Sequence, residues 1–438
     1  MGSEMNKKND HNAEKTEGKK AASGLGRVRV ILIVMLSCIL ITSIFMMVRT
    51  WRNAQESLAA SAPVGTIGKP THATQATVTK PTEAETTAPA TTPSQPAQQV
   101  IDLRFQEYPE EVWLISEAGR AYMQSQEAVG DVGHFLRPYF WTGERNDVGM
   151  PVELAFTVYS LPDGYSVTDV IYQLSESPDF SDATVYIPQE GSYSVAVYGL
   201  YTGRQYYCRA FVTLSDGSVQ VLNGGFRTAI SPRVLTIDGI VNVRDVGGWQ
   251  TMDGKTIRQG LLYRGSELDG DVEPTYKLTE AGIAQMRQML GIRMDMDLRW
   301  AGENVLGPDV KHVSYNVIQY SGAFTQAGQE AIRRVFADLA DPDNYPIYMH
   351  CTYGADRTGT ICYLLEALLG VSDTDLVRDY ELTGLTYQYV SESLLYPFIA
   401  ELQTYDGENT REKVELFLLS IGVTELEIAS IRRIFLEG

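Results

Sequence analysis

Cysteine is scarce in this sequence, with four residues in a chain of 438. Four cysteines are too few for a disulfide framework: Cys38 lies in an apolar run, and Cys208, Cys351 and Cys362 have no obvious pairing. Basic residues are also relatively few: the chain has 36 Lys and Arg and 55 Asp and Glu, which give a net charge of −19. This acidic balance argues against a nucleic-acid partner. No group of His, Asp and Glu has the spacing of metal ligands, so no metal and no other cofactor is predicted.

Charge is missing altogether from residues 30–48, an uninterrupted apolar run. At about 1.5 Å per residue such a run spans the hydrocarbon core of a bilayer. A buried core helix would show a polar face, and this run has none. The polar, Lys-rich residues 1–29 predict a disordered cytoplasmic tail, which places everything after the run outside the cell.

We therefore predict a single-pass anchor in the cell membrane. A cleaved signal peptide stays open, because Ala60-Ser61-Ala62 resembles a cleavage site. Against it, the run is long for a signal peptide, and Arg49 and Arg52 intervene before that site.

Three segments follow the apolar run. Residues 49–100 are rich in Thr, Pro and Ala and predict an extended linker. Residues 101–150 contain scattered aromatic residues and predict an ordered segment without an assignable function. Residues 151–228 alternate apolar and polar side chains between turn signals, which predicts a β-sandwich. Within it, residues 200–210 resemble the late-strand pattern of fibronectin type III modules, which implies a spacer or a docking surface for a partner.

The chemistry of the chain is concentrated between His350 and Gly359, which read HCTYGADRTG. A strand-like run leads in and an apolar helical pattern leads out. A short loop between a strand and a helix N-terminus points successive backbone N–H groups at one spot, where a phosphate group is held. The residues predicted to bind this phosphate are Thr352, Tyr353, Gly354, Ala355, Asp356 and Arg357.

Three side chains of this loop have predicted chemical roles. Cys351 is the nucleophile, and the helix dipole and Arg357 favour its thiolate. Arg357 also reaches two phosphate oxygens bidentately, and the Thr358 hydroxyl is suited to stabilising the sulfur as a leaving group. The loop resembles that of the cysteine-dependent phosphatases, the protein tyrosine phosphatase superfamily.

Residues 231–438 alternate strand and helix patterns and predict an α/β fold with a central sheet flanked by helices. Residues 242–248 read NVRDVGG and residues 263–268 read YRGSEL, followed by the DLR that ends a strand at Arg299. Together with the HCxxGxDRTG loop, these motifs resemble the bacterial secreted tyrosine phosphatase family. The resemblance implies hydrolysis of phosphotyrosine, with phosphoserine, phosphothreonine or phosphoinositides accepted by many members.

The proton donor for the leaving group needs a separate argument. Conventional members of the superfamily take an aspartate from a mobile loop before the cysteine, but residues 311–337 contain no aspartate. Asp356, inside the loop, is the preferred candidate, because similar loops in the family and in myotubularin-like lipid phosphatases use it as the acid. It could instead hold the loop by hydrogen bonds. Asp309, after a Gly-Pro turn, and Asp297, at a strand end, are weaker candidates.

Other residues are predicted to support the site. His350 is expected to orient the loop and tune the thiolate, and Asn242, with Arg244 and Asp245, either supports the loop or forms a turn. Arg264 and Arg299 at strand ends either add positive charge or serve as ion-pair partners, and Asp297 orders the arginines.

Ala355 stands where many relatives of this kind carry a lysine. In relatives that act on phosphoinositides, a basic residue there helps to bind extra ring phosphates. The sequence therefore favours a phosphoprotein substrate. Two alternatives stay open: a phosphoinositide or inositol-polyphosphate phosphatase with the same chemistry, and a non-catalytic surface protein whose β-module binds a partner.

Overall fold

The computed structural model describes residues 100–140, 145–386, 390 and 392–438, and these described residues belong to one compact unit. The predicted tail and membrane anchor, and the predicted linker up to residue 99, lie outside the described residues. Within the described ranges, no helix has both the length and the apolar composition to cross a bilayer.

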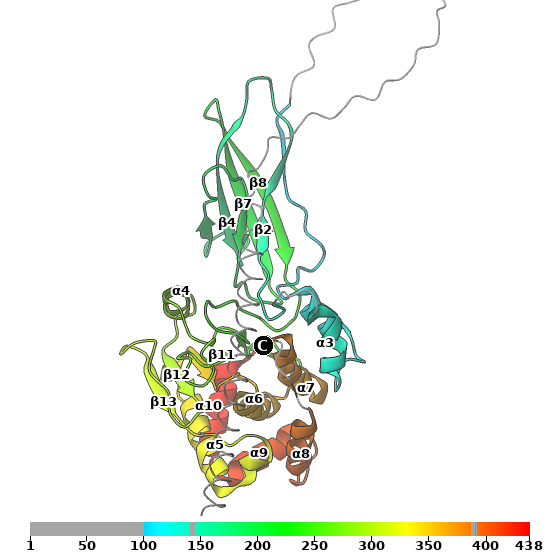
Figure 1. Cartoon of the computed structure of the whole chain (residues 1–438). Helices are drawn as coiled ribbons and strands as arrows, with labels where there is room; N and C mark the ends of the chain where they lie inside the picture. The colour runs from blue at the N-terminus through cyan, green and yellow to red at the C-terminus, as the bar shows by residue number, and fades with distance from the viewer. Residues whose placement is uncertain (1–99, 141–144, 387–389, 391) are drawn as a thin grey trace, which may run out of the picture. The chain divides into compact units, whose positions relative to one another are not determined.

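An antiparallel β-module forms the first part of the unit (Figure 1). Two strand pairs, β1 with β3 and β2 with β6, share an apolar core with a four-stranded sheet of order β5-β4-β7-β8. Strand β7 alternates buried and partly exposed side chains along its length and buries Cys208, as its sequence pattern predicts. The strands are β1 (Asp102–Phe105), β2 (Val152–Leu154), β3 (Phe156–Ser160), β4 (Val167–Ser175), β5 (Thr184–Tyr186), β6 (Val195–Val197), β7 (Gln205–Leu214) and β8 (Val219–Arg227).

The segment that the sequence left unassigned belongs to two structures. Strand β1 pairs with β3 and so extends the β-module upstream of the predicted boundary at residue 151. Helices α2 (Glu117–Gln124) and α3 (Val132–Phe140) instead pack against the catalytic domain, because Tyr122, Val132 and Leu136 are buried in its main core.

The C-terminal domain is built on a five-stranded sheet of order β13-β12-β14-β11-β9, which confirms the predicted sheet flanked by helices. Neighbouring strands are parallel except for β9, which runs antiparallel to β11. Strand β14 (Ile347–His350) sends alternate side chains to opposite faces, Ile347 and Met349 to the main core and Tyr348 to a second core. The other strands are β9 (Arg244–Asp245), β10 (Thr256–Ile257), β11 (Leu262–Gly265), β12 (Met294–Asp297), β13 (Lys311–Ser314) and β15 (Leu436–Glu437).

Helices cover the main core, with α6 (Asp356–Leu369) at its centre (Figure 1). Thr279 caps α4, and Thr424 with Glu427 forms a complete capping box on α10. The remaining helical elements are α4 (Glu280–Ala284), η1 (Gln285–Met289), η2 (Tyr320–Phe324), α5 (Gln326–Leu339), η3 (Pro342–Asn344), α7 (Asp373–Glu381), η4 (Leu382–Thr386), α8 (Glu392–Leu402), α9 (Thr410–Ser420) and α10 (Glu425–Phe435).

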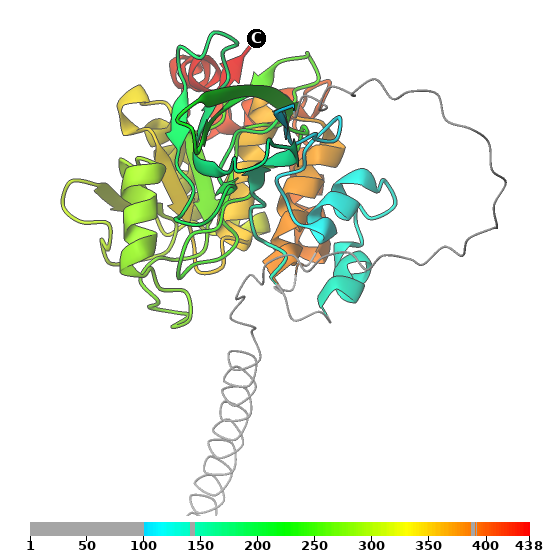
Figure 2. The ribbon, with the colours of Figure 1, turned by 90° about the horizontal axis from the view of Figure 1, so that it is seen from above.

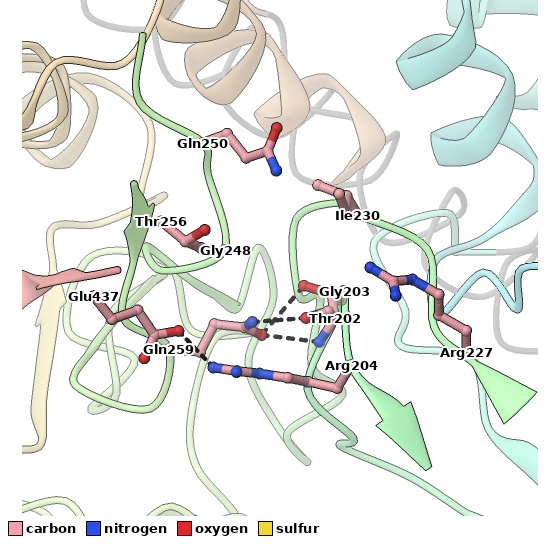
Figure 3. Close-up of a pocket in the computed structure, with 10 residues that line it drawn as sticks. All are labelled: Thr202, Gly203, Arg204, Arg227, Ile230, Gly248, Gln250, Thr256, Gln259 and Glu437. Carbon is pink, nitrogen blue, oxygen red and sulfur yellow. Dashed lines mark hydrogen bonds and ion pairs between the residues drawn. The ribbon is translucent and has the colours of Figure 1, made fainter. Parts of the chain in front are cut away.

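Polar contacts join the β-module to the C-terminal domain (Figure 3). The Gln259 amide bonds the backbone of Thr202 twice, donating to its carbonyl at 2.9 Å and accepting its N–H at 3.0 Å. Arg204 pairs with Glu437 at 2.5 Å across a cavity of about 190 Å³. The two parts are therefore joined by specific polar contacts, of which those between Gln259 and Thr202 are buried.

Candidate active site

The predicted phosphate loop connects β14 to α6, as its strand, loop and helix pattern indicates. Cys351 follows the last residue of β14 and is only 4% exposed, and Asp356 is the first residue of α6. The first N–H groups of a helix have no intrahelical acceptor. They and the loop N–H groups before them are the donors available to an anion at this place.

The loop is held in shape through its carbonyl groups. The carbonyls of residues 352–354 each accept one bond from a different residue: from the N–H of Glu267 at 3.0 Å, from Nδ2 of Asn242 at 3.0 Å, and from Nη2 of Arg264 at 2.8 Å. Turning these carbonyls towards supporting donors leaves the N–H groups for the other side of the loop.

Gly354 is required by this arrangement. Its φ is +67°, a left-handed conformation that other residues seldom adopt. A Cβ there would lie 2.4 Å from the carbonyl oxygen of Gly265. A larger residue would therefore push the loop away from β11.

Beneath the loop, two arginines share one buried carboxylate. Asp379 on α7 accepts from Nε of Arg244 at 3.1 Å and from Nη1 of Arg264. Burial alone would raise the pKa of Asp379, but the two guanidinium groups lower it below its usual value. Arg244 also donates to Oδ1 of Asn242 at 2.5 Å, so Asn242 and Arg264, which hold the loop, rest on the same network.

Arg299 is not available to a substrate. Its guanidinium bonds Asp297 at 2.7 Å and Asp269 at 2.8 Å, and also pairs with Glu267. Of the two roles that the sequence left open for Arg299, the structure shows the ion-pair partner. Both carboxylate oxygens of Asp297 accept from Arg299, which argues against Asp297 as the proton donor.

Arg357 differs from the other arginines of the site. In the described part of the chain it forms no ion pair, and its buried Nε has no hydrogen-bond partner. The buried Thr358 hydroxyl is likewise unpaired among those residues. Both groups are thus uncommitted beside Cys351, as binding of a phosphate requires.

Asp356 belongs to a hydrogen-bonded group with two tyrosines. The Tyr320 hydroxyl donates to Oδ1 of Asp356 and lies 2.7 Å from the Tyr380 hydroxyl. Tyr320 has a φ of +53° and lies within residues 311–337, the stretch that contains no aspartate. Burial and the bond to Asp356 raise the pKa of Tyr320, which keeps it a donor. Asp309, by contrast, is 82% exposed and pairs with Arg287.

His350 is part of a buried chain of polar groups behind Cys351. Its Nε2 lies 2.9 Å from Oδ1 of Asp295, and Nδ1 of His312 lies 2.9 Å from Oδ2 of the same carboxylate. Burial would lower the pKa of His350, but Asp295 outweighs burial and raises it to about 9. Nδ1 of His350 lies 3.3 Å from the Cys351 carbonyl, which links this pair to the loop.

Among the described residues, one group of side chains could bring ligand atoms together for a metal ion. Cys362, Glu366 and Asp379 are buried and have their potential ligand atoms within 4.8 Å of one another. Because Asp379 already accepts from Arg244 and Arg264, their positive charge opposes a cation there.

Matches to known proteins agree with this geometry. Residues 235–436 match the sequence model described as the tyrosine phosphatase family. A Cupriavidus necator protein that carries a tyrosine-protein phosphatase name is 30% identical over 33% of this chain and 61% of its own length. A tyrosine-protein phosphatase of Nostoc commune is 29% identical over 22% of this chain and 41% of its own length. The chain thus matches less than two thirds of the length of either relative.

A solved structure also aligns with part of the chain. It is the core catalytic domain of the PP-IP phosphatase SIW14 from S. cerevisiae, with 14% identity over 36% of this chain and 80% of that chain. Its TM-score is 0.24. The family match, with its relatives, bears out the prediction of a phosphatase enzyme and of a cysteine-dependent phosphatase domain.

The contact between His350 and Asp295 predicts a pH-dependent stability. A histidine whose pKa rises from 6.5 to about 9 on folding stabilises the fold fully below pH 6.5, and this contribution is lost as the pH rises through 9. The shift corresponds to at most about 3 kcal/mol. We expect Asp295→Asn to lower the unfolding midpoint strongly at pH 6 and much less at pH 9.5, as measured by thermal denaturation.

The matched control is Asp309→Asn, at an exposed carboxylate, which should leave the midpoint nearly unchanged at both pH values. An equal loss for Asp295→Asn at pH 6 and at pH 9.5 would contradict the assignment of the charged form to His350.

Proposed function

We propose that the C-terminal domain hydrolyses the phosphate ester of phosphotyrosine, with phosphoserine and phosphothreonine as further substrates, through a phosphocysteine intermediate. The observation that carries this proposal is the loop itself. Its carbonyls at residues 352–354 are held by donors from three other residues of the domain, while Cys351 is a free cysteine and the buried Nε of Arg357 has no partner in the described chain. Such fixed donors stabilise the charge that develops on a transferring phosphoryl group.

The first step is displacement at phosphorus. The Cys351 thiolate attacks, the S–P bond forms, and the bond to the ester oxygen breaks. Arg357 and the loop N–H groups hold the equatorial oxygens, and Asp356 gives its proton to the leaving oxygen. In the second step Asp356 takes a proton from water, the resulting hydroxide oxygen bonds to phosphorus, and the S–P bond breaks. The products are inorganic phosphate and the Cys351 thiolate.

The charges around the loop favour a substrate with a single phosphate. Arg244 and Arg264 share Asp379, and Arg299 is surrounded by three carboxylates. Ala355 adds no charge. Arg357 alone among these arginines is free of a carboxylate partner in the described chain, which suits one phosphate better than a ring of several.

An aromatic pair beside the loop suits an aryl ester. Tyr353, inside the loop, meets Tyr276 edge to face with ring centroids 5.8 Å apart. Aromatic rings bind other rings in this geometry. The tyrosine ring of a substrate would therefore find a matching surface next to the phosphate loop.

The test is phosphate release by residues 95–438 from four compounds: a phosphotyrosine peptide, a phosphoserine peptide, a phosphatidylinositol phosphate and inositol hexakisphosphate. We expect the highest kcat/KM for the tyrosine peptide. Cys351→Ser should lose activity by at least about a thousandfold while the fold survives. Cys362→Ser, at a buried cysteine outside the loop, is the matched control and should retain activity.

Two results would change the proposal. Preference for the inositol compounds would keep the chemistry and overturn the substrate. Release from none of the four by the wild type would overturn the enzymatic proposal in favour of a binding protein.

The acid role of Asp356 predicts a dependence on the leaving group. Asp356→Asn should slow the hydrolysis of phenyl phosphate, whose phenoxide is a poor leaving group, by about a hundredfold or more. Hydrolysis of nitrophenyl phosphate should slow far less, because its leaving group does not need the proton. Tyr320→Phe should show the same trend more weakly, since it removes the bond that positions Asp356. Equal slowing of both esters by Asp356→Asn would exclude the acid role.

We also propose that residues 30–48 anchor the protein with residues 1–29 in the cytoplasm and the catalytic domain outside. The apolar run and its basic flank support this, and the β-module, with its fibronectin type III resemblance, would act as a spacer or partner-binding surface. In intact cells, added protease should digest the catalytic domain of the membrane-bound protein. Protection of that domain would contradict the orientation.

A further inference from the structure

A carboxylate from outside the matched family domain reaches the support of the phosphate loop. Asp147 is buried, and its Oδ2 accepts the backbone N–H of Asn242 at 2.8 Å. Arg145 fixes this carboxylate with two bonds of 3.0 and 2.9 Å and also donates to the Ile240 carbonyl at 3.3 Å. The family match begins at residue 235, so Arg145 and Asp147 lie outside the matched residues.

The backbone conformation of Asn242 needs support of the kind that Asp147 gives. Its φ is +59°, a left-handed conformation in which a residue other than glycine needs local support. From that position its Nδ2 donates to the Tyr353 carbonyl at 3.0 Å, and its Oδ1 accepts from Arg244. Asp147 holds the backbone N–H of the residue whose side chain holds the loop.

The same N-terminal segment also contacts α7, the helix whose Asp379 holds Arg244 and Arg264 beneath the loop. The Tyr122 hydroxyl on α2 donates to Glu381, and the Gly130 N–H donates to Oε1 of Glu381 at 2.8 Å. Arg378 donates to the Ser125 carbonyl at 3.1 Å. Both contacts fix α7, the helix that carries Asp379, and Figures 1 and 2 show the cyan helices of this segment beside it.

We propose that Asp147 is a positioning residue of the phosphate loop. It acts through Asn242, whose side chain keeps the Tyr353 carbonyl turned away from the phosphate. The loop N–H groups are then directed at the phosphate. The effect on turnover rests on the proposed function. The effect on phosphate affinity does not, because it requires only that the loop bind the anion.

The experiment compares variants of the full chain by calorimetry with inorganic phosphate and by kcat/KM for the phosphotyrosine peptide. Asp147→Ala should weaken phosphate binding about tenfold, as loss of a charge-assisted bond predicts. Asp147→Asn should retain affinity within about threefold, since its amide oxygen still accepts the Asn242 N–H. Asp131→Ala, at a carboxylate of the same segment that is 69% exposed, is the matched control and should bind phosphate like the wild type.

A double-mutant cycle separates positioning from general stability. Asn242→Gly deletes the amide side chain and still accepts the left-handed backbone. In that background Asp147→Ala should change phosphate affinity by less than about twofold, because its effect passes through the deleted side chain.

Several outcomes would overturn the proposal: an undiminished tenfold loss in the Asn242→Gly background, or an Asp147→Ala chain with a lowered Tm and wild-type phosphate affinity. A wild-type chain that binds no phosphate would overturn it together with the proposed function. A wild-type chain that binds phosphate but hydrolyses no substrate overturns the proposed function alone, because the phosphate constants still decide the role of Asp147.

Discussion

The active site depends on one buried carboxylate, that of Asp379, held between Arg244 and Arg264. Two guanidinium groups cannot stay in a dry interior without a partner, and removing one member of such a group costs on the order of 3–5 kcal/mol. The cost is linked to function because Arg264 also bonds the Gly354 carbonyl and Arg244 also bonds Asn242. The ion network that makes burial tolerable is thus also the frame that orients the phosphate loop.

Ion pairing around the loop also reduces the positive charge near the phosphate site. A phosphate-binding site is expected to be basic, and yet three of its four arginines are paired with buried or nearly buried acids, Arg244 and Arg264 sharing one carboxylate and Arg299 meeting three. The remaining attraction comes from Arg357, the loop N–H groups and the end of α6, which are short-ranged and directional. Under the proposed function, such a site suits one phosphoryl group better than several.

The sequence predicts the parts of the site that are contiguous. The spacing of Cys351 and Arg357, between a strand pattern and a helix pattern, is enough to place β14, the loop and α6. Asn242 and Arg264 were among the predicted supporting residues, and both bond a loop carbonyl. The carboxylate that joins them could not be predicted, since Arg244 and Asp379 lie 135 residues apart.

Other residues were missed for related reasons. Asp295 and Tyr320 act through side chains that meet only in the folded chain, although an aspartate inside an otherwise buried strand was a signal for the first of them. The position of Arg299 at a strand end did not predict its ion pairs with three acids. The segment before residue 150 was unreadable because its strand and two helices are short, with four, eight and nine residues, one helix containing a proline.

The central claim is that a thiolate at Cys351, presented to a loop held by its carbonyls, takes the phosphoryl group from the substrate. The most direct measurement is mass spectrometry of the protein after acid quenching of its reaction with a phosphotyrosine peptide. The account predicts one phosphoryl group, located on Cys351, that accumulates more in Asp356→Asn when a good leaving group is used, because hydrolysis then lacks its base. A turnover that proceeds with no phosphorylated Cys351 in either protein, or with the phosphoryl group on another residue, would contradict it.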